Sequence, residues 1–404
     1  MSETAEPNVG TFTLGAAITV EPPTPVEVPD HEDWTLPNGF AWIFRGEGNT
    51  TPGSLVRPVI MADGFNLGRS KLDKLYQGLE SGFPFVSELR SRGRDVILLG
   101  FEERSASILD NAQAAEAAIV EAIARRQGNA PLVVGGFSMG GIVTRYALAK
   151  MESQGNRPHE TELYFSYDSP HRGASIPVGV QAFSYFIPFA NDFAKQMDSP
   201  AARQMLWRHY DKDTGKIGIA KERTEFLDAL AEVGWWPAEP RKIAVANGRA
   251  DGVGLPDVTP GAIALRIAQI YPGTTFYTQA QGDDVTVAYL NRRFPAAEKT
   301  VTTDGFPELD GAPGGTLHTY KILADAMEKL GGTVDLRHEE VCFVPSVSAV
   351  AIRDIDTQDA LYAKITEMSP EESELDDFVC SSTTTPHTGI TRELCTWLLS
   401  HLPD

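Results

Sequence analysis

A chain of 404 residues is long enough for one α/β catalytic core that carries an insertion, with two separate domains as the alternative. Hydrophobic residues make up 42% and charged residues 22% of the chain, a composition that excludes global disorder. The formal net charge of −20 disfavours nucleic acid and anionic membranes as partners, because phosphate recognition needs clustered Lys and Arg.

The cysteines and the N-terminal segment predict a cytoplasmic protein. Cys342, Cys380 and Cys395 are odd in number and lack C-x-x-C spacing, so neither a disulfide framework nor a thiolate metal site is expected. Residues 1–30 are acidic and contain several prolines, without the basic and apolar regions of a signal peptide. A membrane span is not expected either, because the chain has no run of about eighteen apolar residues.

Continuous apolar runs alternate with helical patterns in the first half of the chain. Such runs are typical of strands that are covered on both faces, whereas half-exposed strands alternate apolar and polar residues. Ser107 and Asp110 have capping-box spacing at the start of a helix predicted over 107–126. The order predicts an α/β fold with a mostly parallel sheet and helices on both faces. The runs lie at 58–63, 95–100, 131–137 and 162–167.

Residues 176–240 are rich in aromatic residues at helical spacing and predict a helical cap inserted into the core. The core would comprise 55–175 and 241–404, after an N-terminal extension over 1–54 that includes edge strands. A hairpin is expected over 275–289, with Gly282-Asp283-Asp284 serving its turn rather than a calcium site. Apolar residues on one helical face predict a closing helix over 391–402.

The sequence Gly136-Phe137-Ser138-Met139-Gly140 follows the apolar run at 131–137 and precedes a helical segment at 142–149. Small residues beside such a serine leave room for the strained turn from strand to helix. This pattern predicts Ser138 as a nucleophile, and the alternative is a plain turn that contains a serine. The amide of Met139, at the helix N-terminus, would then donate to the oxyanion that forms during attack.

Gly-Phe-Ser-Met-Gly-Gly at 136–141, together with Pro-His-Arg-Gly-Ala at 170–174, resembles the lipase and esterase branch of the α/β-hydrolase superfamily. The resemblance covers roughly 55–170 and the C-terminal histidine segment, but neither the cap nor the middle of the chain. It implies the α/β-hydrolase fold and a second oxyanion-hole amide after the first core strand. That amide is assigned to Phe65, which follows Gly64, with Asn66 as the substitute. The resemblance also implies that His171 fixes its loop rather than acting in catalysis.

The general base is expected late in the chain, because the triad of this superfamily runs serine, acid, histidine. His387 lies in a loop that leads straight into the closing helix, and it is therefore preferred. The alternatives fit less well: His318 starts a helical pattern, His338 lies in a charged stretch and His401 is at the chain end.

Three aspartates compete for the acid of the triad. Asp168 ends the fourth apolar run, beside the serine turn, where a carboxylate needs a partner. Asp251 follows the strand after which most members of the superfamily place their acid, and Asp377 lies ten positions before His387. Asp168 is preferred, and the other two stay open.

These residues predict hydrolysis of carboxylic esters through an acyl-enzyme on Ser138, with His387 as base. The aromatic cap favours a small-molecule ester with an apolar moiety. An acyltransferase or a thioesterase would use the same acyl-enzyme, and a non-catalytic binding protein on this fold is the alternative of another class. No cofactor or metal is expected, because the chain lacks a Gly-x-Gly-x-x-Gly turn, a Walker pattern and zinc spacing. The sequence does not predict an oligomeric state.

Overall fold

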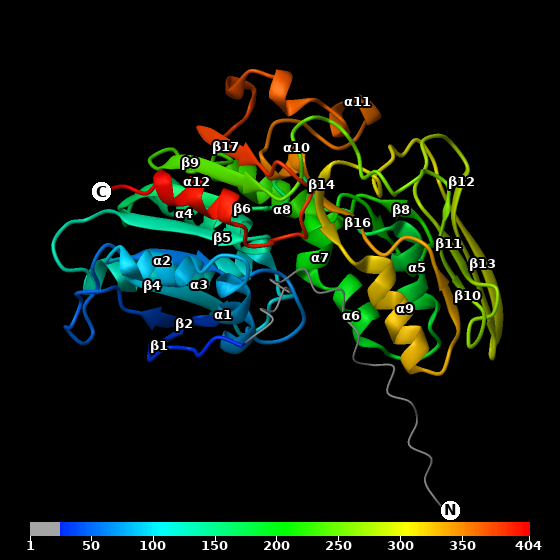
Figure 1. Cartoon of the computed structure of the whole chain (residues 1–404), viewed down its shortest axis with the longest axis horizontal. Coiled ribbons are helices and arrows are strands. Elements are labelled where there is room, and N and C mark those ends of the chain that lie inside the picture. Colours follow the sequence, from blue (N-terminus) through cyan, green and yellow to red (C-terminus); the bar gives the residue numbers. More distant parts are fainter. Residues whose placement is uncertain (1–24) are drawn as a thin grey trace, which may run out of the picture.

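The structure is a computed structural model that describes residues 25–404 (Figure 1). Its larger sheet has eight strands. Their order is β1-β2-β4-β3-β5-β6-β9-β17. Strand β2 is antiparallel to both of its neighbours, and every pair from β4 to β17 is parallel. The strands are β1 (Glu32–Leu36), β2 (Gly39–Phe44), β3 (Val59–Ala62), β4 (Val96–Phe101), β5 (Leu132–Phe137), β6 (Thr161–Tyr167), β9 (Arg241–Ala246) and β17 (Asp377–Cys380).

The central strands of this sheet are buried on both faces. In β4, Val96 and Leu98 pack with α1, α2 and α12, whereas Ile97 and Leu99 pack with α3 and α4 on the other face. This three-layer arrangement and the strand order confirm the predicted α/β-hydrolase fold. The covering helices are α1 (Leu72–Glu80), α2 (Phe85–Ser91), α3 (Ile108–Arg125), α4 (Met139–Gln154) and α12 (Arg392–Ser400).

Helix α12 confirms the closing helix, and its N-cap is Thr391, whose side chain accepts from the Leu394 amide. Helix α3 also begins as expected, with the Ser107 side chain accepting from the Leu109 amide. The partner of this cap is Gln204 rather than Asp110, because Gln204 accepts from the Ile108 amide and donates to Ser107.

Two insertions at the carboxyl ends of strands form a second lobe beside the larger sheet (Figure 1). The first follows β6 and contains α5–α8. The second follows β9 and contains a five-stranded antiparallel sheet in the order β13-β12-β11-β10-β15. The first insertion holds α5 (Val178–Phe186), α6 (Asp192–Met197), α7 (Pro200–Met205), β7 (His209–Tyr210), β8 (Ile217–Gly218) and α8 (Lys221–Glu232). The second holds β10 (Ile263–Ile267), β11 (Thr275–Tyr277), β12 (Val285–Arg293), β13 (Ala296–Thr303), β14 (Gly314–Leu317), α9 (Thr319–Lys329), β15 (Val334–Leu336), β16 (Val341–Pro345), α10 (Ser346–Ala349) and α11 (Gln358–Leu361).

The two insertions share one core. The ring of Phe183 in α5 meets the ring of Phe276 in β11 edge-on, with 5.5 Å between centroids. A β-carbon on Gly179 of α5 would lie 2.8 Å from the β-carbon of Ala288 in β12, so helix and sheet are in close contact. Helix α5 thus covers one face of this sheet, whose strands are half-buried.

This arrangement differs from the sequence-based division, which assigned all of 241–404 to the core and made the cap helical. From that range, β9, β17 and α12 belong to the large sheet and its helical layers, α10 packs against β9, and a second sheet joins the helices of 176–240. The reason is that β12 and β13 are half-buried strands of a local hairpin, whereas the sheet is completed by β15, which pairs with β10 much earlier in the chain. The expected hairpin over 275–289 is present as the β11–β12 pair, in which Thr275 opposes Tyr289. In the extension predicted over 1–54, β1 and β2 form the sheet edge, and residues 1–24 lie outside the described part.

Candidate active site

Ser138 lies in the tight turn between β5 and α4. Its backbone has φ 53° and ψ −123°, and the Ser138 amide donates to the Tyr167 carbonyl over 2.9 Å. The turn also needs a glycine, because a β-carbon on Gly140 would lie 2.2 Å from the carbonyl oxygen of Ala62. The first turn of α4 is therefore pressed against the end of β3, as a nucleophile elbow requires.

His387 joins Ser138 to Asp168. Its Nε2 is 2.8 Å from Ser138 Oγ, and its Nδ1 is 2.6 Å from Asp168 Oδ2. A carboxylate only accepts, so Nδ1–H donates to Asp168 and Nε2 accepts from the Ser138 hydroxyl. All three residues are buried, and the Phe343 ring packs edge-on against the imidazole with 4.8 Å between centroids. The arrangement can move a proton from the serine to the imidazole and stabilise the imidazolium that results.

Asp168 directly follows β6, and its carboxylate is completely buried. Its Oδ1 accepts from the Asn247 amide over 3.0 Å. A β-carbon on Gly315 would lie 2.1 Å from Asp168 Oδ2, so a glycine at this position makes room for the carboxylate. Both carboxylate oxygens thus have a donor, which is what a buried charge needs.

The loop that carries His387 lies between β17 and α12. The His387 amide donates to the Thr316 carbonyl over 2.7 Å, and Pro386 and Thr316 form an isolated parallel bridge. Strand β14 of the second insertion therefore supports the loop. Sequence reasoning missed Thr316, Gly315 and Phe343, because no local pattern connects these positions with His387.

The segment predicted to hold the second oxyanion-hole amide lies against the start of α4. A β-carbon on Gly140 would be 2.6 Å from the Asp63 carbonyl oxygen, which places residues 62 and 63 beside the elbow. Burial raises the pKa of the Asp63 carboxyl, while Arg104, with Nη1 3.8 Å from Oδ2, opposes that shift. Asp63 Oδ1 accepts from the Gly64 amide, which shapes the turn before Phe65. The oxyanion-hole roles of the Phe65 and Met139 amides stay predictions.

The two alternative acids lie elsewhere and contact other groups. Asp251 pairs with Arg249 and accepts from the Val253 amide. Asp377, in β17, lies 3.0 Å from Arg241 Nη2 and 3.2 Å from His401 Nε2. Neither forms a hydrogen bond with His387, so of the three aspartates the structure brings only Asp168 to the histidine.

The other histidines considered from the sequence also lie apart from Ser138. His401 contacts Asp377, and His318 Nδ1 is 3.9 Å from Glu340. The side chain of His338 lines a surface pocket beside His318.

His171 is buried, as its loop-fixing assignment requires. Its Nε2 is 2.8 Å from Ser166 Oγ, and its Nδ1 is 3.5 Å from Arg145 Nη1. Because a guanidinium only donates, Nδ1 accepts and Nε2–H donates to Ser166. Burial lowers the pKa of His171 well below its usual value, and the nearby Arg145 and Arg172 lower it further. His171 is therefore a neutral structural group.

Within residues 25–404, one group of three side chains has the proximity that a metal site would need, namely Glu152, His159 and Glu239. The Thr161 amide donates to His159 Nδ1 over 3.1 Å, so the proton of the neutral ring is on Nε2. That Nε2 lies 3.0 Å from Glu152 Oε1 and donates to it. Hydrogen bonds within the protein account for this group, and it does not present a free histidine lone pair to a metal.

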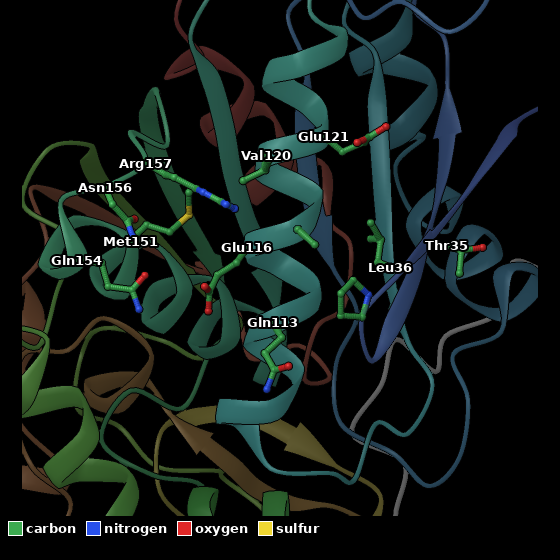
Figure 2. Close-up of a pocket in the computed structure, with 12 residues that line it drawn as sticks. Thr35, Leu36, Gln113, Glu116, Val120, Glu121, Met151, Gln154, Asn156 and Arg157 are labelled. Carbon is green, nitrogen blue, oxygen red and sulfur yellow. The ribbon is translucent and has the colours of Figure 1, made fainter.

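Two of the surface pockets formed by the described residues illustrate sites away from Ser138, His387 and Asp168. One, of about 490 Å³, lies between the β1–β2 turn and helices α3 and α4, with Leu36, Val120 and Met151 among its lining residues (Figure 2). The other, of about 700 Å³, is lined by residues 255–258 and 337–340 together with His318 and Thr384. Neither pocket includes a residue of the triad. In the part of the chain that the structure describes, helices with the length and apolar character to cross a bilayer are absent.

The protein is similar to several solved hydrolases at low sequence identity. For a lipase of Bacillus licheniformis in mature form, identity is 14% and TM-score 0.31, with 51% of this chain and 72% of that chain covered. For a hyperthermophilic esterase of Pyrobaculum calidifontis, identity is 14% and TM-score 0.34, with 57% of this chain and 66% of that chain covered. For an esterase B of Lactobacillus rhamnosis, identity is 13% and TM-score 0.34, with 56% of this chain and 69% of that chain covered. No protein-family model and no curated protein matches the sequence. These likenesses are weak, and the fold rests on the strand order described above.

Proposed function

We propose that the protein is a serine hydrolase that cleaves carboxylic esters through an acyl-enzyme on Ser138. The observation that carries this proposal is the continuous chain of hydrogen bonds from Ser138 Oγ through His387 to the buried carboxylate of Asp168. A serine in an elbow, a histidine on its hydroxyl and a carboxylate on the other ring nitrogen are the parts that acyl transfer to serine needs.

In the proposed reaction, Ser138 Oγ forms a bond to the carbonyl carbon of the ester while its proton passes to His387 Nε2. The carbonyl electron pair moves to the oxygen, and the Met139 and Phe65 amides donate to this oxyanion. When the oxyanion collapses, the bond to the alcohol breaks, and Nε2 returns the proton to the leaving oxygen. Water then attacks the acyl-enzyme with His387 as base, which releases the acid and restores Ser138.

Asp168 supports the base in both halves of this cycle. Its carboxylate selects the tautomer in which Nε2 can accept a proton, and it stabilises the imidazolium afterwards. The apolar ring of Phe343 packs on His387. This ring supports an ester with an apolar moiety as the substrate.

The proposal is tested by labelling the purified protein with a fluorophosphonate probe, which reacts with activated serines. We expect stoichiometric labelling of the wild type, none in Ser138→Ala and much slower labelling in His387→Ala. Ser153→Ala serves as the control, because Ser153 is exposed in the same helix, α4. A series of p-nitrophenyl esters from acetate to laurate then measures the preferred acyl length. A folded wild type that neither reacts with the probe nor cleaves any of these esters would contradict the proposal.

A further inference from the structure

Asn247 contacts both the acid and the base of the proposed triad. It directly follows β9, and its side chain is completely buried. Its backbone amide donates to Asp168 Oδ1 over 3.0 Å. Its side-chain Nδ2 donates to Thr385 Oγ1 over 2.7 Å and to the Gly389 carbonyl over 2.9 Å. One residue therefore binds the carboxylate with its main chain and the histidine loop with its side chain.

The two side-chain contacts lie on either side of His387. Thr385 precedes the histidine by two positions and Gly389 follows it by two. The Asn247 carbonyl in turn accepts from the Thr385 amide and hydroxyl, each over 3.0 Å. Between these anchors, Thr388 has φ 56°, a conformation that a residue other than glycine holds only with support. Hydrogen bonds thus hold the loop on both sides of His387, whose two ring nitrogens contact Ser138 and Asp168.

The chemistry of the contacts fixes which atom of the amide faces the loop. A main-chain carbonyl only accepts, so the group that faces Gly389 must be the NH₂ of Asn247. The hydroxyl of Thr385 uses its proton toward the Asn247 carbonyl and its oxygen toward Nδ2. Aspartate and leucine have nearly the same shape as asparagine, but neither offers these two donors.

We infer that Asn247 is a positioning residue for the reaction, which holds Asp168 and His387 in the relative geometry that the triad needs. This inference rests on the proposed function. It follows because the bond between His387 and Asp168 is 2.6 Å long and buried, so a small displacement of the loop weakens it. A weaker bond stabilises the imidazolium less, which lowers the rate of acyl transfer and changes how that rate depends on pH.

The test compares Asn247→Leu and Thr385→Val with a control, Asn111→Leu. Leucine removes both donors at 247, and valine removes only the hydroxyl of Thr385 while keeping its shape. Asn111 is buried and donates from Nδ2 to the Glu103 carbonyl, away from the triad, so its variant reports the general effect of losing a buried amide. Steady-state kinetics are measured over pH with a p-nitrophenyl ester, and unfolding in urea is measured for each variant.

In Asn247→Leu we expect kcat to fall by roughly 10-fold to 100-fold with KM nearly unchanged. The pH profile of kcat/KM should also change, with its acid limb displaced from that of the wild type. Thr385→Val should show a smaller change in the same direction, and adding it to Asn247→Leu should have less effect than it has alone, because the shared hydrogen bond is already lost. Asn111→Leu should lose stability without moving the acid limb.

The inference is overturned if folded Asn247→Leu keeps the wild-type kcat, or if its acid limb coincides with that of Asn111→Leu. Should Asn247→Leu fail to fold, Thr385→Val decides alone, and an unmoved acid limb in it would overturn the inference. Failure of the proposed function is a different result, because the wild type itself would then leave the ester and the fluorophosphonate probe unreacted.

Discussion

Three residues around the candidate site have a left-handed backbone although none is glycine. Their φ values are 53° for Ser138, 49° for Asp168 and 56° for Thr388. Such conformations cost roughly 1–3 kcal/mol each and persist where the surroundings hold them. Here the amide of Ser138 donates to Tyr167 and that of Asp168 donates to Val245, so the neighbouring strands hold two of these positions. The strain thus lies where Ser138, Asp168 and the loop that carries His387 leave regular structure.

At the scale of single residues, we predict that Asp168, of the three candidate aspartates, acts as the acid. Asp168→Asn should lower kcat by on the order of 10⁴-fold, because the amide can donate to Nδ1 and would favour the wrong tautomer of His387. Asp251→Asn and Asp377→Asn should stay close to the wild type, since both carboxylates pair with exposed arginines. The measurement is the steady-state rate on a p-nitrophenyl ester for all three variants. Equal losses in Asp168→Asn and Asp251→Asn would reject Asp168 as the sole acid.

At the scale of elements, the elbow depends on how closely α4 approaches β3. The start of α4 can press on the end of β3 only because Gly140 has no β-carbon. The same contact brings the segment that contains Phe65 beside the helix N-terminus, where amide groups point outward. The geometry of the proposed oxyanion hole and the packing of β3 on α4 therefore both depend on Gly140.

Gly140→Ala is expected to lower the free energy of unfolding by about 1–3 kcal/mol, the usual cost of forcing an extra methyl group into a packed site. It should also slow fluorophosphonate labelling of Ser138, because relief of the clash moves the elbow. Gly218→Ala is the matched control, since a β-carbon there meets nothing within 4 Å. Urea unfolding followed by tryptophan fluorescence checks the first effect. A stable Gly140→Ala protein with normal labelling would show that the contact is not tight.

For the whole molecule, the second lobe contains a buried carboxyl that links stability to pH. Asp310 is buried, and its Oδ2 accepts from the Gln279 amide over 2.9 Å. Burial raises its pKa to about 6, so the folded state holds this proton more tightly than the unfolded state does. Stability from this group is therefore complete below pH 4 and is lost as pH rises to about 6.

Asp310→Asn should remove this loss, because an amide oxygen can accept the same hydrogen bond without carrying a charge. We expect the variant to exceed the wild type by about 3 kcal/mol in the free energy of unfolding at pH 8, and by much less at pH 4. Urea titrations at the two pH values measure the difference. A constant difference across pH would mean that the carboxyl does not titrate in this range in the folded protein.

Local patterns in the sequence were sufficient for the features that a short segment encodes. Continuous apolar runs predicted the parallel sheet, Gly136 to Gly140 predicted the elbow, and amphipathic spacing predicted α12. Each depends on residues within one or two turns of one another, so their physical cause is visible in a short window. The preference for Ser138 and His387 came from the same kind of evidence, read through the resemblance to hydrolases.

Only the tertiary structure decided which aspartate lies beside His387 and how the second lobe is built. Asp168, Asp251 and Asp377 all follow or occupy strands, and the difference among them is a distance across the sheet that no local pattern encodes. The five-stranded sheet was missed for the same reason, because β10 pairs with β15 across four intervening strands and helix α9. Asn247 was overlooked as well, since its importance comes from hydrogen bonds to residues 168, 385 and 389. Pairings between distant segments depend on the assembled fold, because hydrogen bonds form only once packing has brought their partners together.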